Sequence, residues 1–338
     1  MPNPALTEKI RNLPPLLDSL ERDAEVSDLL RRSDAARERF RQMFPLDGVE
    51  QSALEDYRKE WMARYVYNSN AIEGSTLTLE DTELVLEGEF VPTDSPARYI
   101  FAARGVADGM AYAERFAEEE RTLSVEMIQK LHEVTALDMQ PALRGRFRPY
   151  GYQARITATR VKTADPLEIY EDMEALVDAV NGSKDHPILK AAGFHAMFEN
   201  IHPFTDGNGR TGRQILNLML MAAGYRPVAI KHDAGRSYGK SLEAWQVDGD
   251  PKPFISQLVQ CVDQEERTES DIAAAFREET ANHSWNADDL ASQAGIDPRF
   301  ADALLQRGEA PIEAVFSAAD ALGIDIAALP LSSLGNTR

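Results

Sequence analysis

The sequence predicts a mainly α-helical protein with one small β-hairpin. Most of the 338-residue chain carries apolar residues at the three- and four-residue spacing of a helix that buries one face. β-Branched residues are concentrated in one short stretch, residues 152–163. The regular alternation of strands and helices that builds a parallel sheet is missing from the pattern. Hydrophobic residues make up 43% of the chain, which is ordinary for a globular protein.

Two helical segments are predicted before residue 70. Residues 5–40 are charged and amphipathic, and Pro14 and Pro15 interrupt them, because proline lacks an amide proton and clashes with the preceding helical turn. Residues 51–67 form a clearer helix, with large apolar side chains at helical spacing. We expect residues 1–50 to form a separate N-terminal helical segment.

Residues that can cap helices mark the next two elements. Thr78 precedes a helical pattern over residues 79–88, and Asp81 stands at the position of an acidic variant of the capping box. Ser124 stands in the same position before an apolar helical pattern that contains Ile128. Both helices should therefore begin at these polar residues.

Residues 152–163 differ from their surroundings, because Tyr152, Ile156, Val161 and the intervening threonines favour extended backbone. We interpret this stretch as a short hairpin. The helical patterns that follow it cover residues 166–181, 187–200, 208–223, 237–247 and 251–278.

Residues 202–213 combine features suited to binding an anion, and read His-Pro-Phe-Thr-Asp-Gly-Asn-Gly-Arg-Thr-Gly-Arg. Gly207 and Gly209 let the backbone bend and approach a ligand closely. Asn208 between them tolerates left-handed or cap geometry, and the helical pattern starts near it. The unpaired amide protons and the dipole of that helix N-terminus favour negative charge.

Charged and ionisable side chains surround this bend. Arg210 and Arg213 are three residues apart and share a helix face. Two guanidinium groups beside backbone amides suit a di- or triphosphate better than a single carboxylate. Asp206 offers a hard oxygen for Mg²⁺, and His202 can act as a general base. An ordinary turn would explain neither the histidine nor the arginines, so we favour a functional interpretation.

The segment resembles the signature of the Fic family, His-Pro-Phe-x-(Asp/Glu)-Gly-Asn-Gly-Arg-x-x-Arg, and agrees with it at every fixed position. Similar segments on both sides, including the upstream run from Gly145 to Arg148, extend the resemblance over about residues 60–265. Fic proteins are mostly adenylyltransferases, which move AMP from ATP to a hydroxyl of a target protein. The resemblance implies a Fic-type helical core with a hairpin flap within residues 51–278.

The resemblance also assigns roles around ATP. His202 would be the catalytic base, Asp206 would hold Mg²⁺ against the α- and β-phosphates, and the Asn208 amide would join the backbone amides of residues 207–209 in an anion hole. Arg210 would hold the β-phosphate and Arg213 the γ-phosphate. The other residues implied around the nucleotide are Thr211, Gly212, Ala158, Thr159, Arg160, Val161, Tyr238 and Gln246.

A second motif, which runs from Ser69 through Glu73 to Gly74, resembles the inhibitory motif of one Fic class, Ser/Thr-x-x-x-Glu-Gly/Asn. Ser69 and Glu73 are one helical turn apart and share a face. The resemblance implies that Glu73 pairs with Arg213 and keeps that arginine from the γ-phosphate. The alternative is an ordinary exposed glutamate before a helix-ending glycine.

Residues 284–338 predict a small separate helical domain that resembles a repressor-type helix-turn-helix. Asn286 can cap its first helix, Gly295 suits the turn, and Pro298 can open the second helix. Eight acidic residues against three arginines give this segment the wrong charge for phosphate contacts, so DNA binding is not expected. We interpret the segment as a protein-contact or dimerisation module.

The composition of the chain limits the classes of partner and the cellular compartment that we expect. A formal net charge of −20 argues against nucleic acid or an anionic membrane surface as the main partner. No apolar run approaches the ~20 residues of a membrane span, and no signal peptide is apparent. Cys261 is the only cysteine, so a disulfide within the chain is excluded and we expect a reducing cytoplasm.

We therefore predict a self-restrained protein adenylyltransferase that uses ATP and Mg²⁺ and modifies a Ser, Thr or Tyr hydroxyl of a target protein. Self-modification and a homodimer remain open. One alternative is removal of AMP from a modified protein by the same site, with Glu73 aligning a water molecule. Another is a regulatory or interaction protein of toxin–antitoxin type with a quiescent Fic domain.

Overall fold

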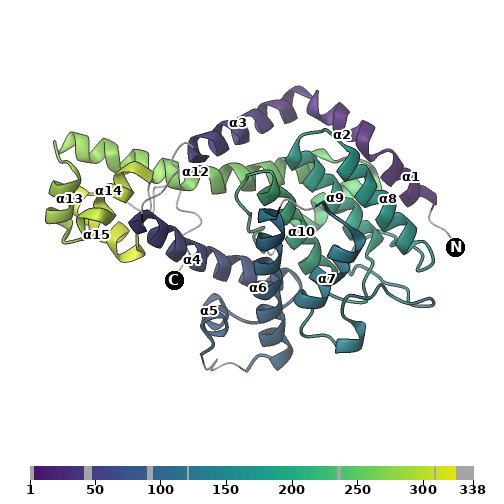
Figure 1. Ribbon diagram of the computed structural model, residues 1–338. Coiled ribbons are helices and arrows are strands. Elements are labelled where there is room, and N and C mark those ends of the chain that lie inside the picture. The colour runs from purple at the N-terminus through teal and green to yellow at the C-terminus, as the bar shows by residue number, and fades with distance from the viewer. Residues whose placement is uncertain are drawn as a thin grey trace. The chain divides into compact units, whose positions relative to one another are not determined.

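A computed structural model describes residues 4–41, 48–89, 94–119, 122–233, 237–307 and 310–324. Helices dominate these residues (Figure 1). The helices are α1 (Pro4–Arg11), α2 (Leu13–Glu21), α3 (Ala24–Arg41), α4 (Gly48–Ile72), α5 (Leu79–Glu87), α6 (Ala97–Glu118), α7 (Val125–Thr135), the 3₁₀ turn η1 (Pro141–Leu143), α8 (Ile169–Gly182), α9 (Pro187–Ile201), α10 (Asn208–Ala222), α11 (Ser237–Glu243), the π-helical turn η2 (Ala244–Asp248), α12 (Lys252–Asn282), α13 (Ala287–Ala294), α14 (Pro298–Arg307) and α15 (Ile312–Leu322). Within the described residues, no helix is both long enough and apolar enough to span a membrane.

The chain divides into two compact units, one made of Met1–Arg31 and Ala63–Cys261 and the other of Arg32–Met62 and Val262–Arg338. The candidate site residues predicted from the sequence all belong to the first unit. The second unit contains α13, α14 and α15, which share a core built from leucine, alanine and valine side chains such as Leu290, Leu304 and Val315.

Helices α9 and α10 form the centre of the first unit. Every residue of α9 from Ile188 to Ile201 is buried except Lys190, as expected for a helix surrounded by others. Helix α10 packs on α9, α6 and α7 (Figure 1), while α8, α1 and α2 cover the other sides of α9. The end of α9 and the start of α10 are therefore held by a packed core.

The sequence correctly marks several helix starts. Thr78 and Asp81 form a capping box at the start of α5, and Ser124 accepts a hydrogen bond from the Met127 amide at 3.2 Å at the start of α7. The break near the two prolines falls at Asn12, and both prolines lie in the first turn of α2, where their missing amide protons leave no helical bond unmade.

The prediction of a hairpin over residues 152–163 is wrong, because all of these residues are described and none forms a strand. Ala158 has a φ of 60°, and the Thr163 hydroxyl donates to the Ala154 carbonyl at 2.9 Å where a hairpin would use main-chain pairs. The flap is a loop, and among the described residues an isolated bridge pairs Phe147 with Phe204. β-Type residues favour a strand only where a sheet is present to pack on.

Helix α6 is absent from the sequence-based prediction. Its Gly105 and Gly109 lie so close to Thr135 of α7 that a Cβ at either position would overlap atoms of that residue. Glycine lowers helix propensity, but here it allows α6 to approach α7 and α10 closely. Tertiary contact thus outweighs the local preference of the chain.

Asp172 of α8 supports a prediction about stability. It is 1% exposed, its Oδ1 accepts a hydrogen bond from Thr7 of α1 at 3.0 Å, and its Oδ2 has no partner among the described residues. Burial raises the pKa of this carboxyl to about 6. Because the folded pKa lies above the unfolded value, ionised Asp172 destabilises the fold increasingly as pH rises from about 4 to 6.

We expect Asp172→Asn to raise the free energy of unfolding by about 1–2 kcal/mol at pH 7.5 and by much less at pH 4.5. Urea unfolding at the two pH values measures this difference. Asp178→Asn, at an exposed position of the same helix, serves as the control. An equal effect of Asp172→Asn at both pH values would contradict the assignment.

Candidate active site

The site begins where α9 ends. His202 follows the last residue of α9 and has left-handed backbone angles, with φ 54° and ψ 60°. Such angles are uncommon outside glycine and mark a position held by its surroundings. The turn directs the chain out of the core and into the loop that leads to α10.

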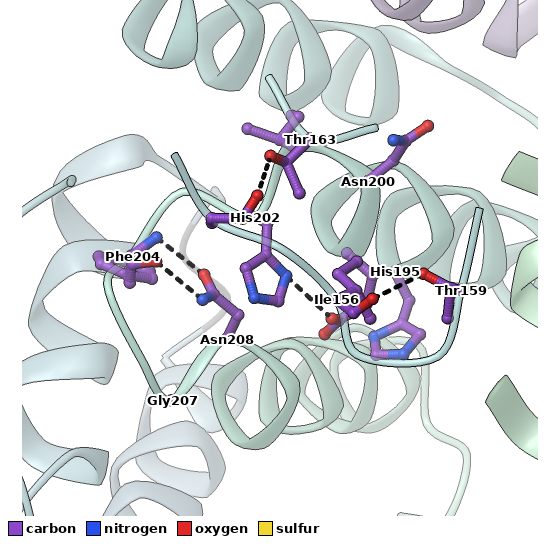
Figure 2. Close-up of polar contacts among 12 residues, drawn as sticks. Ile156, Thr159, Thr163, His195, Asn200, His202, Phe204, Gly207 and Asn208 are labelled. Carbon is purple, nitrogen blue, oxygen red and sulfur yellow. Dashed lines mark hydrogen bonds and ion pairs between the residues drawn. The ribbon is translucent and has the colours of Figure 1, made fainter. Parts of the chain in front are cut away.

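Asn208 fixes the shape of this loop. Its side-chain Oδ1 accepts from the Phe204 amide at 2.8 Å, and its Nδ2 donates to the Phe204 carbonyl at 2.9 Å (Figure 2). Phe204 is fully buried, so the pair ties the loop to the core. The side-chain amide of Asn208, expected in the anion hole, is therefore bound to the main chain of the loop.

Two buried residues that the sequence did not assign to the site support the loop from outside. His132 of α7 lies within 2.9 Å of the Asp206 carbonyl through Nε2, and its Nδ1 accepts from the Gly145 amide at 2.9 Å. Its ring stacks on Phe204 with centroids 3.7 Å apart. Burial lowers the pKa of His132 to about 4, so the ring remains neutral and holds the loop without charge.

Arg148 is the second support. Its Nε donates to the His202 carbonyl at 2.8 Å, and its Nη2 donates to the carbonyls of Ile201 and Ala164. Its Nη1 reaches the Tyr152 carbonyl at 2.9 Å. One buried guanidinium thus satisfies the carbonyls at the end of α9 and joins them to the flap.

Asp206 and Arg210 lie where the loop joins the start of α10. The Asp206 side chain is 70% exposed, and its Oδ1 accepts from the Gly207 amide at 2.6 Å and lies 3.8 Å from Nη2 of Arg210. Arg210 is buried and donates to Asp138 at 2.7 Å. A buried cation and an accessible carboxylate therefore stand side by side where α10 begins.

Arg213 of α10 is held by Ser69, near the end of α4, and by Glu73, which directly follows α4. Its Nε donates to the Ser69 hydroxyl at 3.0 Å, and its Nη2 donates to the Ser69 carbonyl and to Oε1 of Glu73, each at 2.8 Å. The aromatic ring of Tyr238 lies 5.8 Å from the guanidinium carbon. The structure thus brings together the arginine and the two motif residues that lie more than a hundred positions upstream.

Glu73 also lies against the start of α10. A Cβ on Gly209 would overlap the Glu73 carboxylate, so only glycine admits this contact. Burial favours the neutral form of Glu73, but the charge and hydrogen bond of Arg213 outweigh burial and hold its pKa below the usual value. Glu73 is therefore an anion placed on the backbone that would receive a phosphate.

The His202 side chain lies beside that of Asn208 (Figure 2). Burial lowers its pKa to about 4, while the charge of Glu73 acts in the opposite direction. At neutral pH the imidazole is uncharged and has a lone pair to accept a proton. This is the protonation state that a general base requires.

The remaining residues predicted around the nucleotide lie either on helices, described first, or on the flap. Thr211 and Gly212 are buried, and Gly212 packs against Phe198 of α9. Tyr238 lies within 2.6 Å of His195 through its hydroxyl, next to Arg213. Gln246 is buried and donates to the Ala196 carbonyl at 2.7 Å, so its amide nitrogen is occupied by α9.

The flap residues lie on a loop fastened to α11 and η2. The Thr159 hydroxyl donates to the Ile156 carbonyl at 3.0 Å (Figure 2). Arg160 donates to Glu243 at 2.6 Å and to Asp248 at 2.7 and 3.0 Å. Ala158 and Val161 flank this anchored pair in sequence, so the segment is held in place by charge rather than by strand pairing.

Comparison with known proteins agrees with this geometry. Residues 122–220 match the Fic/DOC family. The protein adenylyltransferase Fic of Nematostella vectensis is 31% identical over 214 residues, which cover 61% of this chain and 48% of that protein. The protein adenylyltransferase fic-1 of Caenorhabditis elegans is 32% identical over 213 residues, covering 60% and 40%. The chain thus spans about half or less of the length of these relatives.

Solved structures show the same fold. The crystal structure of a Fic domain containing signaling protein from Bacteroides thetaiotaomicron has a TM-score of 0.62 at 24% identity and covers 70% of this chain and 95% of that one. Fic-1 (residues 134–508) from C. elegans has a TM-score of 0.61 at 27% identity and covers 75% and 72%. The chain therefore has a mainly α-helical Fic-like fold, and the residues that match the Fic/DOC family, 122–220, include the loop and both arginines.

Proposed function

We propose that this protein transfers AMP from ATP to a hydroxyl of a target protein and that Glu73 restrains the transfer. The observation that carries the proposal is the meeting of a neutral imidazole, a helix N-terminus and two buried arginines within one loop and one helix. Similarity to proteins named protein adenylyltransferases supports the same reaction.

His202 would take the proton of the acceptor hydroxyl. The freed oxygen then bonds to the α-phosphorus of ATP as the bond from that phosphorus to the pyrophosphate oxygen breaks, and pyrophosphate leaves. Arg148 and Asn208 hold the loop on either side of His202, so the ring is placed before substrate binds. Positioning of this kind is the main contribution expected in phosphoryl transfer.

The start of α10 would hold the phosphates. The amides of residues 207–209 and the helix dipole favour negative charge, and phosphate would replace the Asp206 oxygen on the Gly207 amide and the Glu73 carboxylate beside Gly209. Arg210 would hold the β-phosphate, and Arg213 would hold the γ-phosphate once Glu73 moves away. Because both guanidinium groups are buried, their charges are weakly screened by solvent.

Asp206 fits a Mg²⁺ ion. Its carboxylate is largely exposed, lies beside the proposed phosphate site, and uses one oxygen for the Gly207 amide. Magnesium usually binds through one or two carboxylates together with phosphate oxygens and water. When bound, the ion would neutralise phosphate charge and orient the leaving group.

A second candidate reaction is removal of AMP from a modified protein. Glu73 favours it, because its side chain is 42% exposed and only its Oε1 is bound to Arg213. The charge of Glu73 also acts on His202, so the two groups share one site. A carboxylate in that place could align a water molecule for attack on the AMP phosphorus.

Labelled ATP separates these reactions. When the Glu73→Gly protein is incubated with Mg²⁺ and a mixture of cellular proteins, protein should acquire label from α-labelled ATP and none from γ-labelled ATP. Self-modification would appear in the same experiment as one added AMP by intact mass. Label from neither nucleotide, together with release of AMP from a pre-modified protein by the unaltered chain, would replace transfer by removal.

A further inference from the structure

Glu199 lies one helical turn before His202 on α9 and has no role in the site described so far. It is 7% exposed, and its carboxylate is wedged between α9 and α10. A Cβ on Gly212 of α10 would lie 2.6 Å from its Oε1. The carboxylate therefore occupies space that only glycine at position 212 leaves open.

Neither Glu199 nor the ring nitrogen it faces is satisfied. Oε1 of Glu199 and Nδ1 of His202 are both buried without a hydrogen-bond partner among the described residues. Oε2 of Glu199 lies 3.8 Å from that Nδ1, and the Glu199 carbonyl also faces the ring. Burying a polar group without a partner is unfavourable, so two such groups this close indicate a state in which they pair.

The charges around Glu199 come from several elements. Arg213 faces it from α10, Tyr238 from α11, and Glu73 from the turn that follows α4. His195 lies beside it on α9. Burial raises the pKa of Glu199 to about 8, Arg213 opposes this, and Glu73 adds to it. In the resting protein both Glu199 and His202 are therefore mainly uncharged at neutral pH.

We propose that Glu199 is a positioning residue for His202. The proposal rests on the transfer reaction above and takes Nε2 as the nitrogen of His202 that accepts the hydroxyl proton. For Nε2 to accept it, the other proton of the ring must be on Nδ1, and ionised Glu199 accepts that N–H. The same carboxylate then stabilises the imidazolium, as a buried acidic group does for the histidine of other nucleophile–base pairs. Glu199 itself keeps its charge through the step.

Kinetics provide the first test. In a Glu73→Gly background, Glu199→Gln keeps the volume between α9 and α10 and removes the charge. We expect kcat for AMP transfer to fall by about 100-fold, with KM for ATP changed less than about twofold, because the carboxylate acts through His202. Glu133→Gln, at a half-exposed ion pair on α7, is the matched control and should change neither constant.

The pH profile distinguishes positioning from a merely structural role. In the Glu73→Gly protein, transfer should rise as Glu199 ionises, at a pH below about 8 because Glu73 no longer raises that pKa. Glu199→Gln should abolish this rise and leave a flat profile. Parental kcat and pH dependence in Glu199→Gln would overturn the proposal.

A measurement without turnover separates this proposal from the transfer reaction. Nitrogen NMR of labelled histidine, with the His202 signal identified by its loss in His202→Ala, reports which ring nitrogen carries the proton. The Nδ1–H form should become dominant as Glu199 ionises, and Glu199→Gln should remove that change. If Glu73→Gly transfers no AMP, the proposed function fails, whereas identical ring signals with and without Glu199 would refute the pairing itself.

Discussion

Replacing His202 by asparagine in the Glu73→Gly protein is expected to lower AMP transfer by about 10²–10⁴-fold, which is the usual contribution of a general base. Asparagine is the better replacement than alanine, because position 202 has a left-handed backbone that asparagine tolerates. The variant should therefore keep the loop and lose only the proton acceptor. The rate of AMP addition, followed by intact mass, measures the effect.

The control for His202→Asn is nucleotide binding. The helix N-terminus, Arg210 and the backbone amides remain in place, so calorimetry with ATP and Mg²⁺ should give an affinity close to that of the Glu73→Gly parent. His283→Asn, at an exposed histidine of the second unit, should leave both quantities unchanged. Transfer at the parental rate by His202→Asn would mean that another group removes the hydroxyl proton.

The parts of this protein that its sequence predicts are those set by neighbouring residues. Thr78 and Ser124 cap helices with amides only three residues away, so each cap can be identified within a few residues of sequence. The bend between α9 and α10 is equally local, because Gly207 and Asn208 shape it within a few positions. Short-range chemistry of this kind depends little on the rest of the fold.

The parts that the sequence did not predict depend on distant contacts. Arg148 and His132 hold the loop through contacts with main-chain carbonyls. Every residue has such a carbonyl, so no pattern of residue types in the sequence predicts these contacts. Glu199 appears in the sequence as one more polar residue of a buried helix. The pairing of Glu73 with Arg213, by contrast, joins residues 140 positions apart and is expected only because the motif resembles that of a known family.

Replacing Glu73 by glycine is expected to raise AMP transfer by about 5- to 150-fold, the range given by a coupling free energy of about 1–3 kcal/mol. Glu73 competes with the γ-phosphate for Arg213 and adds a second negative charge beside it. Removing the carboxylate leaves Arg213 bound to the Ser69 hydroxyl and carbonyl, so the guanidinium remains in place for the nucleotide. The rate of label transfer from α-labelled ATP measures the change.

One further variant shows whether the charge or the bulk of the Glu73 side chain causes the restraint. Glu73→Gln retains the length of the side chain and removes its charge, so it should release part of the restraint. Glu89→Gly, at an exposed position after α5, controls for backbone flexibility and should leave transfer unchanged. Because Glu73 also lies against Gly209, Glu73→Gly and Glu73→Gln should both bind ATP at least as tightly as the unaltered chain. Normal ATP binding with unchanged transfer in Glu73→Gly would exclude restraint by this residue, and lower transfer would make Glu73 a participant in the chemistry.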